Sequence, residues 1–136
     1  MLRALFAKLH VILYRLLRGR LVGRWGKAPV LLLTTRGRRS VRLRTTPVLY
    51  LAESDVYAVV ATNDGAPRDP GWFLNLAAHP QAEVEVGGKR IAVTAETATD
   101  DERTRLWPAL RNIYPNYQRD QDRTDRQLPV VLLRPA

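Results

Sequence analysis

The sequence contains no cysteine among its 136 residues, and this absence removes several classes of function. Without a thiol there is no disulfide framework, no thiolate nucleophile, and no cysteine-ligated metal ion or iron–sulfur cluster. The two histidines, His10 and His79, lie far apart, and neither has neighbours at the spacing of metal ligands. We therefore expect no metal site.

Acidic residues are missing from the first 52 positions. These positions carry twelve lysines and arginines, whereas residues 53–136 carry ten against thirteen aspartates and glutamates. The net charge of +9 therefore originates in the first part of the chain. Such a one-sided field attracts an anionic partner: a nucleic acid, an anionic membrane, or a small molecule with phosphate or carboxylate groups.

Long apolar runs are also missing. No run approaches the roughly 20 residues of a membrane span. The apolar N-terminus is interrupted by Lys8, His10 and Arg15 and shows no cleavage site of a secretory signal. We therefore expect a cytoplasmic protein. The length and the apolar content of 46% fit one domain over residues 1–136.

The N-terminal segment, residues 2–18, has the periodicity of a basic amphipathic helix. Leucine, isoleucine and phenylalanine side chains share one face, and the opposite face is wholly basic. Such a helix caps the core of a domain or lies on an anionic membrane, and the two functions are compatible.

The rest of the chain reads mainly as short strands. Strands are expected at Val30–Thr35, Val41–Leu51, Val56–Thr62, Ala82–Val86, Lys89–Thr97 and Leu128–Leu133. Helices are expected at Trp72–His79 and from Thr99 to about Tyr114, and residues 115–127 read as a polar loop. This order predicts a mainly β (α+β) fold of about six strands: a small antiparallel barrel or sandwich, with the N-terminal helix and one or two further helices packed outside.

The predicted hairpin Thr34–Pro47 carries five arginines and five hydroxyl side chains, and no acid. Guanidinium groups suit phosphate and carboxylate, and Gly37 allows the backbone to approach a ligand closely. The turn could therefore cradle a phosphate, or it could be an exposed and solvated basic turn. We expect no nucleic-acid partner, because the arginines are not interleaved with aromatic side chains for base stacking.

Two further segments could line a pocket. Val60–Leu76 joins a strand, a turn-rich loop and a short helix, and its Trp72 would pack on a planar ring or in the core. Tyr114 and Tyr117 follow a predicted helix. Their phenols could donate a proton or hydrogen bond to a substrate, or could simply lie on the surface.

Several segments together resemble the deazaflavin-dependent nitroreductase family, split-barrel oxidoreductases that use coenzyme F-420 and occur chiefly in actinobacteria. The matching pieces lie in family order over about residues 28–134: LLLTTRGRRSVRLRTTPVLYL, APRDPGWFLNLAAHPQAEVEVGGKRIAVTA, DDERTRLWPAL and IYPNYQRDQDRTDRQLPVVLL. F-420 has a tail with a phosphate and a lactyl-oligoglutamate chain, which would explain the basic hairpin.

The resemblance implies a set of cofactor-binding and substrate-binding residues. In this reading the phosphate binds to Arg38, Arg39 and Ser40, with Arg44 as a second anchor. The deazaflavin ring would be bounded by Pro47, Val48, Leu49, Val60, Ala61, Thr62, Asn63, Trp72 and Asn75. The acceptor would meet Tyr114, Tyr117 and Asp120. Asp120 stands where some family members have a third tyrosine, which alters the substrate side of the pocket.

The implied reaction transfers a hydride from reduced F-420 to an electron-poor acceptor: a quinone, an activated alkene or a nitro compound. Tyr117 would donate a proton, with Thr62 as its hydrogen-bonding partner. One alternative keeps the barrel and replaces the cofactor with FMN. Another is a non-catalytic deazaflavin-binding or carrier protein. The basic N-terminal helix resembles that of members that act on membrane-soluble quinones, so peripheral contact with an anionic membrane is possible. The oligomeric state does not follow from the sequence.

Overall fold

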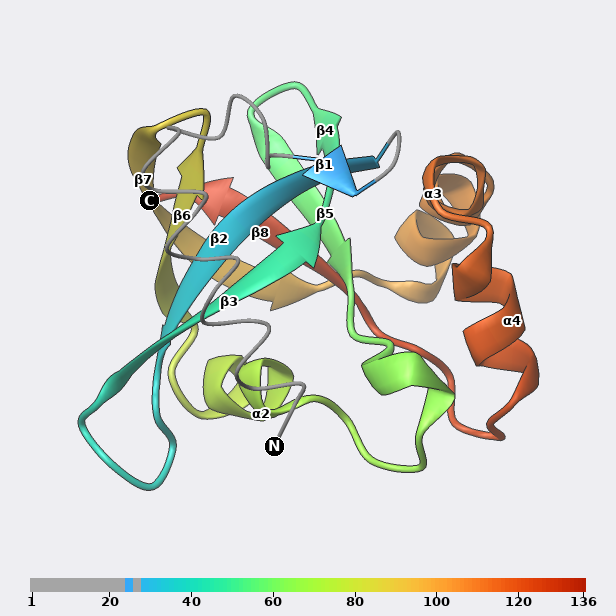
Figure 1. Ribbon diagram of the computed structural model, residues 1–136, viewed down its shortest axis with the longest axis horizontal. Coiled ribbons are helices and arrows are strands. Elements are labelled where there is room, and N and C mark those ends of the chain that lie inside the picture. The colour runs from blue at the N-terminus through green and yellow to red at the C-terminus, as the bar shows by residue number, and fades with distance from the viewer. Residues whose placement is uncertain (1–23, 26–27) are drawn as a thin grey trace.

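The computed structural model describes residues 24–25 and 28–136, which form a strongly curved antiparallel sheet with helices beside it (Figure 1). Along the sheet the strands follow the order β1 (Arg24–Trp25), β2 (Ala28–Arg36), β6 (Gln81–Val86), β7 (Lys89–Thr97), β8 (Val130–Pro135), β5 (Val56–Val60) and β4 (Leu51–Glu53). β3 (Leu43–Leu49) pairs with the other edge of β2.

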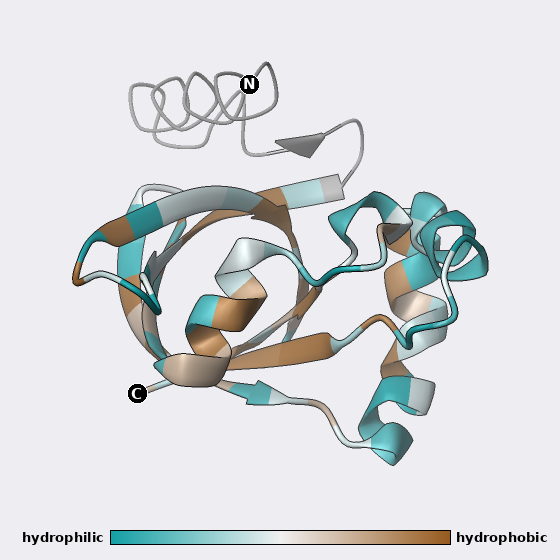
Figure 2. Ribbon diagram, turned by 90° about the horizontal axis from the view of Figure 1, so that it is seen from below, coloured by the Kyte–Doolittle hydropathy of each residue, from teal (hydrophilic) through white to brown (hydrophobic). Residues whose placement is uncertain are grey.

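The sheet curls into a barrel (Figure 2) that is split between the edge strands β3, beside β2, and β4, beside β5. The chain crosses this split between β3 and β4 at Tyr50, whose N–H donates to the carbonyl of Pro29 at 3.1 Å. The predicted split barrel is confirmed, although the described residues form eight strands where the sequence pattern indicates about six.

Two apolar clusters hold the sheet. The central strands β2, β5 and β8 supply both clusters because their successive side chains point to opposite faces and both faces are covered. One cluster lies within the barrel and includes Leu31, Leu33, Val59, Val84, Val93, Val131, Leu133 and Leu76. The other lies under the C-terminal helices and includes Val30, Val60, Leu106, Leu110, Tyr117, Leu128, Val130 and Leu132.

The helices flank the barrel. The 3-10 helix η1 (Asn63–Gly65) and α2 (Gly71–Ala78) follow β5, and α3 (Asp100–Ile113) and α4 (Asn116–Asp122) precede β8. α3 begins with a capping box, in which the side chains of Thr99 and Glu102 each accept a hydrogen bond from the other's backbone N–H. Pro108 is exposed, so its ring lies away from the buried face of α3.

Some local predictions are wrong. Residues 115–127 are not all loop, because α4 lies within them. Few of its side chains are buried, so it has no apolar periodicity, and bonds such as Gln118 Nε2 to Asp122 Oδ1 (2.9 Å) support it. The single strand expected at Val41–Leu51 is divided, since β3 ends at Leu49 and β4 begins at Leu51.

The predicted helix over residues 2–18 lies outside the described residues. Within the part of the chain that the structure describes, no helix is long and apolar enough to cross a membrane.

Candidate active site

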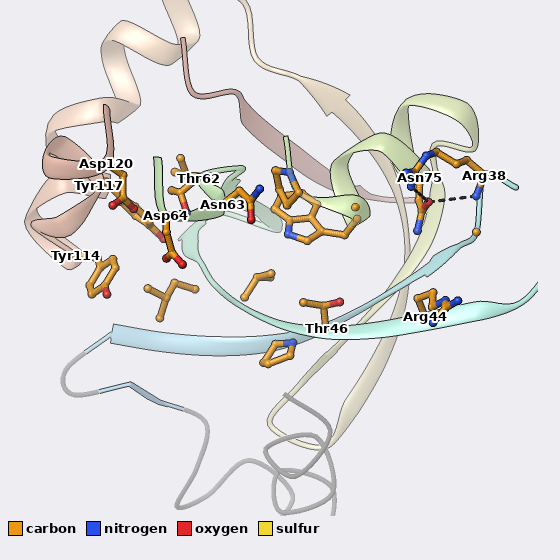
Figure 3. Close-up of a pocket in the computed structure, with 18 of the residues that line it drawn as sticks. Arg38, Arg44, Thr46, Thr62, Asn63, Asp64, Asn75, Tyr114, Tyr117 and Asp120 are labelled. Atoms are coloured by element: carbon orange, nitrogen blue, oxygen red, sulfur yellow. Dashed lines mark hydrogen bonds between the residues drawn. The ribbon is translucent and has the colours of Figure 1, made fainter. Parts of the chain in front are cut away.

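A cavity of about 990 Å³ opens at the split in the barrel (Figure 3). Its walls come from β3, the end of β5, η1, the start of α2, and the region where α3 meets α4. Its volume suits a cofactor together with a small substrate. The lining residues are Gly37, Arg38, Arg39, Ser40, Arg44, Thr46, Pro47, Val48, Leu49, Val60, Thr62, Asn63, Asp64, Pro70, Gly71, Trp72, Asn75, Tyr114, Tyr117 and Asp120.

The arginine-rich turn between β2 and β3 forms the basic end of this cavity. Its base is closed by a hydrogen bond from the N–H of Gly37 to the carbonyl of Arg42 at 2.9 Å. A Cβ at Gly37 would lie 2.8 Å from the hydroxyl oxygen of Ser40 and 3.2 Å from the carbonyl oxygen of Arg42, so any other residue there would displace the Ser40 hydroxyl from its place in the turn. The guanidinium groups and the Ser40 hydroxyl are donors suited to a phosphate.

A buried amide fixes the position of this turn. Asn75 on α2 is 6% exposed, and its Oδ1 accepts from both the backbone N–H and Nη1 of Arg38, each at 3.1 Å. Its Nδ2 donates to Thr35 Oγ1 at 3.1 Å. Asn75 therefore joins α2 to β2 and orients Arg38, in addition to lining the cavity (Figure 3).

The wall after β5 has a tight, left-handed backbone. Asn63 and Asp64 have φ angles of +48° and +56°, values that asparagine and aspartate tolerate better than most residues. Thr62 Oγ1 accepts from the N–H of Asp64 at 3.4 Å, and Asn63 Nδ2 donates to the carbonyl of Arg68 at 2.9 Å. These bonds present Thr62, Asn63 and Asp64 to the cavity.

Arg126 holds this wall from behind. Its guanidinium donates to the carbonyls of Thr62 (2.7 Å), Ala66 (2.8 Å) and Ala61 (3.4 Å). It also forms an ion pair with Asp69 at 2.8 Å, and only 17% of its side chain is exposed. One arginine thus satisfies several carbonyls of the loop after β5 and ties that loop to the segment before β8.

The opposite end of the cavity carries two tyrosines and a carboxylate. The rings of Tyr114 and Tyr117 meet edge to face with centroids 5.2 Å apart. Tyr117 is 5% exposed and also packs against Trp107. Burial, followed by the neighbouring Tyr114 and Asp120, raises the pKa of Tyr117 well above its usual value. Its phenol therefore stays protonated and serves better as a hydrogen-bond donor than as an acid.

The structure brings nearly all the predicted site residues to this one cavity. Ala61 is the exception: it is fully buried, and its N–H donates to the carbonyl of Pro129. Trp72 lines the cavity and also packs on Phe73, with ring centroids 6.4 Å apart. Its two sequence interpretations, ring contact and core, are therefore compatible.

Sequence reasoning missed Thr35 as a partner of Asn75, and Asp64 and Arg126 altogether. Thr35 and Arg126 act across separations of 40 and up to 65 residues, which no local pattern reveals. Asp64 lies in a turn-rich stretch, where an acidic residue is ordinary.

Residues 6–135 match the family model described as "F420H(2)-dependent quinone reductase". The chain is 42% identical over 133 residues to a protein of Mycobacterium tuberculosis with the same description, covering 93% of this chain and 87% of the relative.

Solved structures agree with this relationship. A structure described as an F420-H2 dependent reductase is 35% identical, covers 77% of this chain and 93% of its own, and superposes with a TM-score of 0.72. Another, described as a domain-swapped dimer, is 30% identical, covers 93% and 92%, and has a TM-score of 0.74. On the strength of the family match and the M. tuberculosis relative, the chain belongs to the F420H(2)-dependent quinone reductase family.

Proposed function

We propose that this oxidoreductase binds reduced F-420 in the cavity at the barrel split and passes its hydride to a quinone held beside Tyr114 and Tyr117. The observation that carries this proposal is a single cavity with an arginine-rich turn at one end and a tyrosine pair at the other. The family supplies the cofactor and the class of reaction.

The residues present fit the cofactor. Arg38, Arg39 and Ser40 offer charged and neutral donors for a phosphate, and Arg44 adds a cation on the same side. The wall of Pro47, Val48 and Leu49 is apolar, as a planar ring system needs. Asn75 already holds Arg38 in place, so less ordering is required when the anion binds.

The chain's part in the reaction is to bind, orient and exclude water. When bound, reduced F-420 supplies the hydride, and the protein fixes the acceptor close to it. Val60 and Trp72 limit the space beside the ring, and Thr62 offers a hydroxyl. Tyr117 donates a hydrogen bond to the acceptor oxygen that becomes negative, and solvent provides the proton that completes the hydroquinone.

Tyr117→Phe should lower turnover about tenfold or more while leaving the dissociation constant of F-420 nearly unchanged. The variant removes one donor at the developing negative charge, and a hydrogen bond to a charged group contributes about 1.5–3 kcal/mol. Quinone reduction and cofactor titration on the same preparations separate the two effects. Tyr57→Phe, which alters a tyrosine outside the cavity lining, is the control. Unchanged turnover in Tyr117→Phe would remove this role from the phenol.

A peripheral position at the membrane would bring the enzyme to lipid-soluble quinones. The support for it is the sequence of residues 2–18, whose apolar and basic faces are typical of helices on anionic surfaces. The full chain should sediment with vesicles containing anionic lipid and should be released by salt. Lys8→Glu with Arg15→Glu should abolish this sedimentation. Equal sedimentation of the variant and the unaltered chain would contradict the membrane proposal.

A further inference from the structure

The cavity carries opposite charges at its two ends (Figure 3). Arg38 and Arg44 lie on the side of the hairpin, whereas Asp64 and Asp120 lie on the side of η1 and α4. Under the proposed function the arginines bind the anionic tail of the cofactor. The two carboxylates have no part in that proposal, although they line the end where the acceptor would bind.

Asp120 is built firmly into this wall. It is 7% exposed, and its carbonyl accepts from the N–H of Arg123 at 3.2 Å within α4. The helix packs directly on η1, since a Cβ at Gly65 would lie 2.6 Å from the carbonyl oxygen of Asp120. These contacts fix the backbone of Asp120, which is buried and lines the cavity.

Two opposing influences act on the charge of Asp120 inside the cavity. Burial raises the pKa of its carboxyl, and the attraction of Arg123 and Arg119 opposes this shift. Both arginines are exposed, so water screens them more than it screens the buried carboxylate. Asp120 in turn contributes to the raised pKa of Tyr117, so its charge acts at the phenol that faces the acceptor.

We propose that Asp120 makes the acceptor end selective for uncharged quinones and against acceptors that carry a carboxylate or sulfonate. This inference rests on the proposed quinone reductase function and specifies its substrate class. Asp64 contributes in the same sense but less, because it is exposed. A carboxylate about 6 Å from an anionic group on the acceptor, in partly screened surroundings, repels it. This repulsion lowers the affinity for the charged acceptor about five- to tenfold relative to that for a neutral one.

The test compares a neutral naphthoquinone with its ring-sulfonated analogue, at about pH 8, where an aspartate is ionised. In Asp120→Asn, the ratio of kcat/KM for the sulfonated acceptor to that for the neutral one should rise about five- to tenfold. Asp120→Glu should retain the ratio of the unaltered protein. Asp64→Asn should raise the same ratio by a smaller factor. Asparagine tolerates the left-handed backbone at this position, so this variant tests the proposal even if Asp120→Asn does not fold.

Asp125→Asn is the matched control, because it removes the same charge from an exposed residue outside the cavity lining. The inference would be overturned if the ratio of kcat/KM for the sulfonated acceptor to that for the neutral one were unchanged in both Asp120→Asn and Asp64→Asn. It would also be overturned if Asp125→Asn raised this ratio equally. A second readout needs no turnover: calorimetric titration of the sulfonated quinone into protein saturated with oxidised F-420 should show the same gain in affinity for Asp120→Asn. If the unaltered protein binds F-420 but reduces neither quinone, the proposed function fails, and that result is distinct from an unchanged ratio.

Discussion

Replacing Arg38 and Arg39 together with alanine should weaken the binding of F-420 by about a hundredfold or more. Each guanidinium that bonds a phosphate contributes about 1.5–3 kcal/mol, so two of them account for roughly 3–6 kcal/mol. Both side chains line the basic end of the cavity, and Asn75 orients Arg38 toward it. Quenching of tryptophan fluorescence measures the affinity, since Trp72 also lines this cavity.

The same hairpin offers a matched control. Arg36 and Arg42 are exposed arginines within a few residues of the turn, but they do not line the cavity. Their replacement with alanine changes the net charge equally, so it should weaken binding only by a small long-range effect that disappears in salt. If the two double variants lost affinity to the same extent, the turn would act through its general field and would not be a phosphate cradle.

Arg126→Ala should lower the free energy of unfolding by about 3 kcal/mol and impair quinone reduction as well. The substitution leaves a mostly buried Asp69 carboxylate without its ion-pair partner and removes donors from the carbonyls of Ala61, Thr62 and Ala66. Breaking a buried pair by removing one partner costs about 3–5 kcal/mol, and partial exposure reduces this cost. Denaturant unfolding measures the change.

Two further variants serve as comparisons for the unfolding measurement on Arg126→Ala. Arg126→Lys keeps the charge but loses the forked geometry, so its stability should fall between the alanine variant and the unaltered chain. Arg119→Ala removes an exposed arginine from the neighbouring helix and should change stability by no more than about 0.5 kcal/mol. An Arg126→Ala protein as stable as Arg119→Ala would show that the loop after β5 holds its shape without this arginine.

Much of the fold was predictable because its signals are local. The alternation in β6 and β7 and the glycine pair between them specify a hairpin, and Thr99 with Glu102 marks the start of α3. α4 escaped prediction because it is short, polar and supported by contacts with other elements rather than by an apolar stripe. Trp107, for example, donates its ring N–H to Gln118 at 2.9 Å.

The candidate site was predictable as a set of segments but not as a geometry. The arginine-rich turn stands out by composition, and the tyrosine pair stands out by its place after a predicted helix. The resemblance to a known family then assigned that pair to the substrate side. The bond from Asn75 to Arg38 spans 37 positions and depends on how α2 packs on β2, so no spacing rule could suggest it. The resemblance indicated Asp120 on the substrate side, but nothing indicated Asp64, which comes near it only through the packing of α4 on η1.

One assay asks whether this chain transfers the hydride of reduced F-420 to a quinone. Reduced F-420 and a neutral naphthoquinone are mixed with catalytic amounts of the protein, and the absorbance of oxidised F-420 is followed against a protein-free blank. We expect oxidation that depends on the protein and saturates with both reactants, and no comparable protein-dependent rate above the blank when reduced FMN replaces reduced F-420. A rate equal to the blank, although F-420 binds, would contradict the reductase function and favour the carrier alternative. An equal or faster rate with FMN would contradict the choice of cofactor.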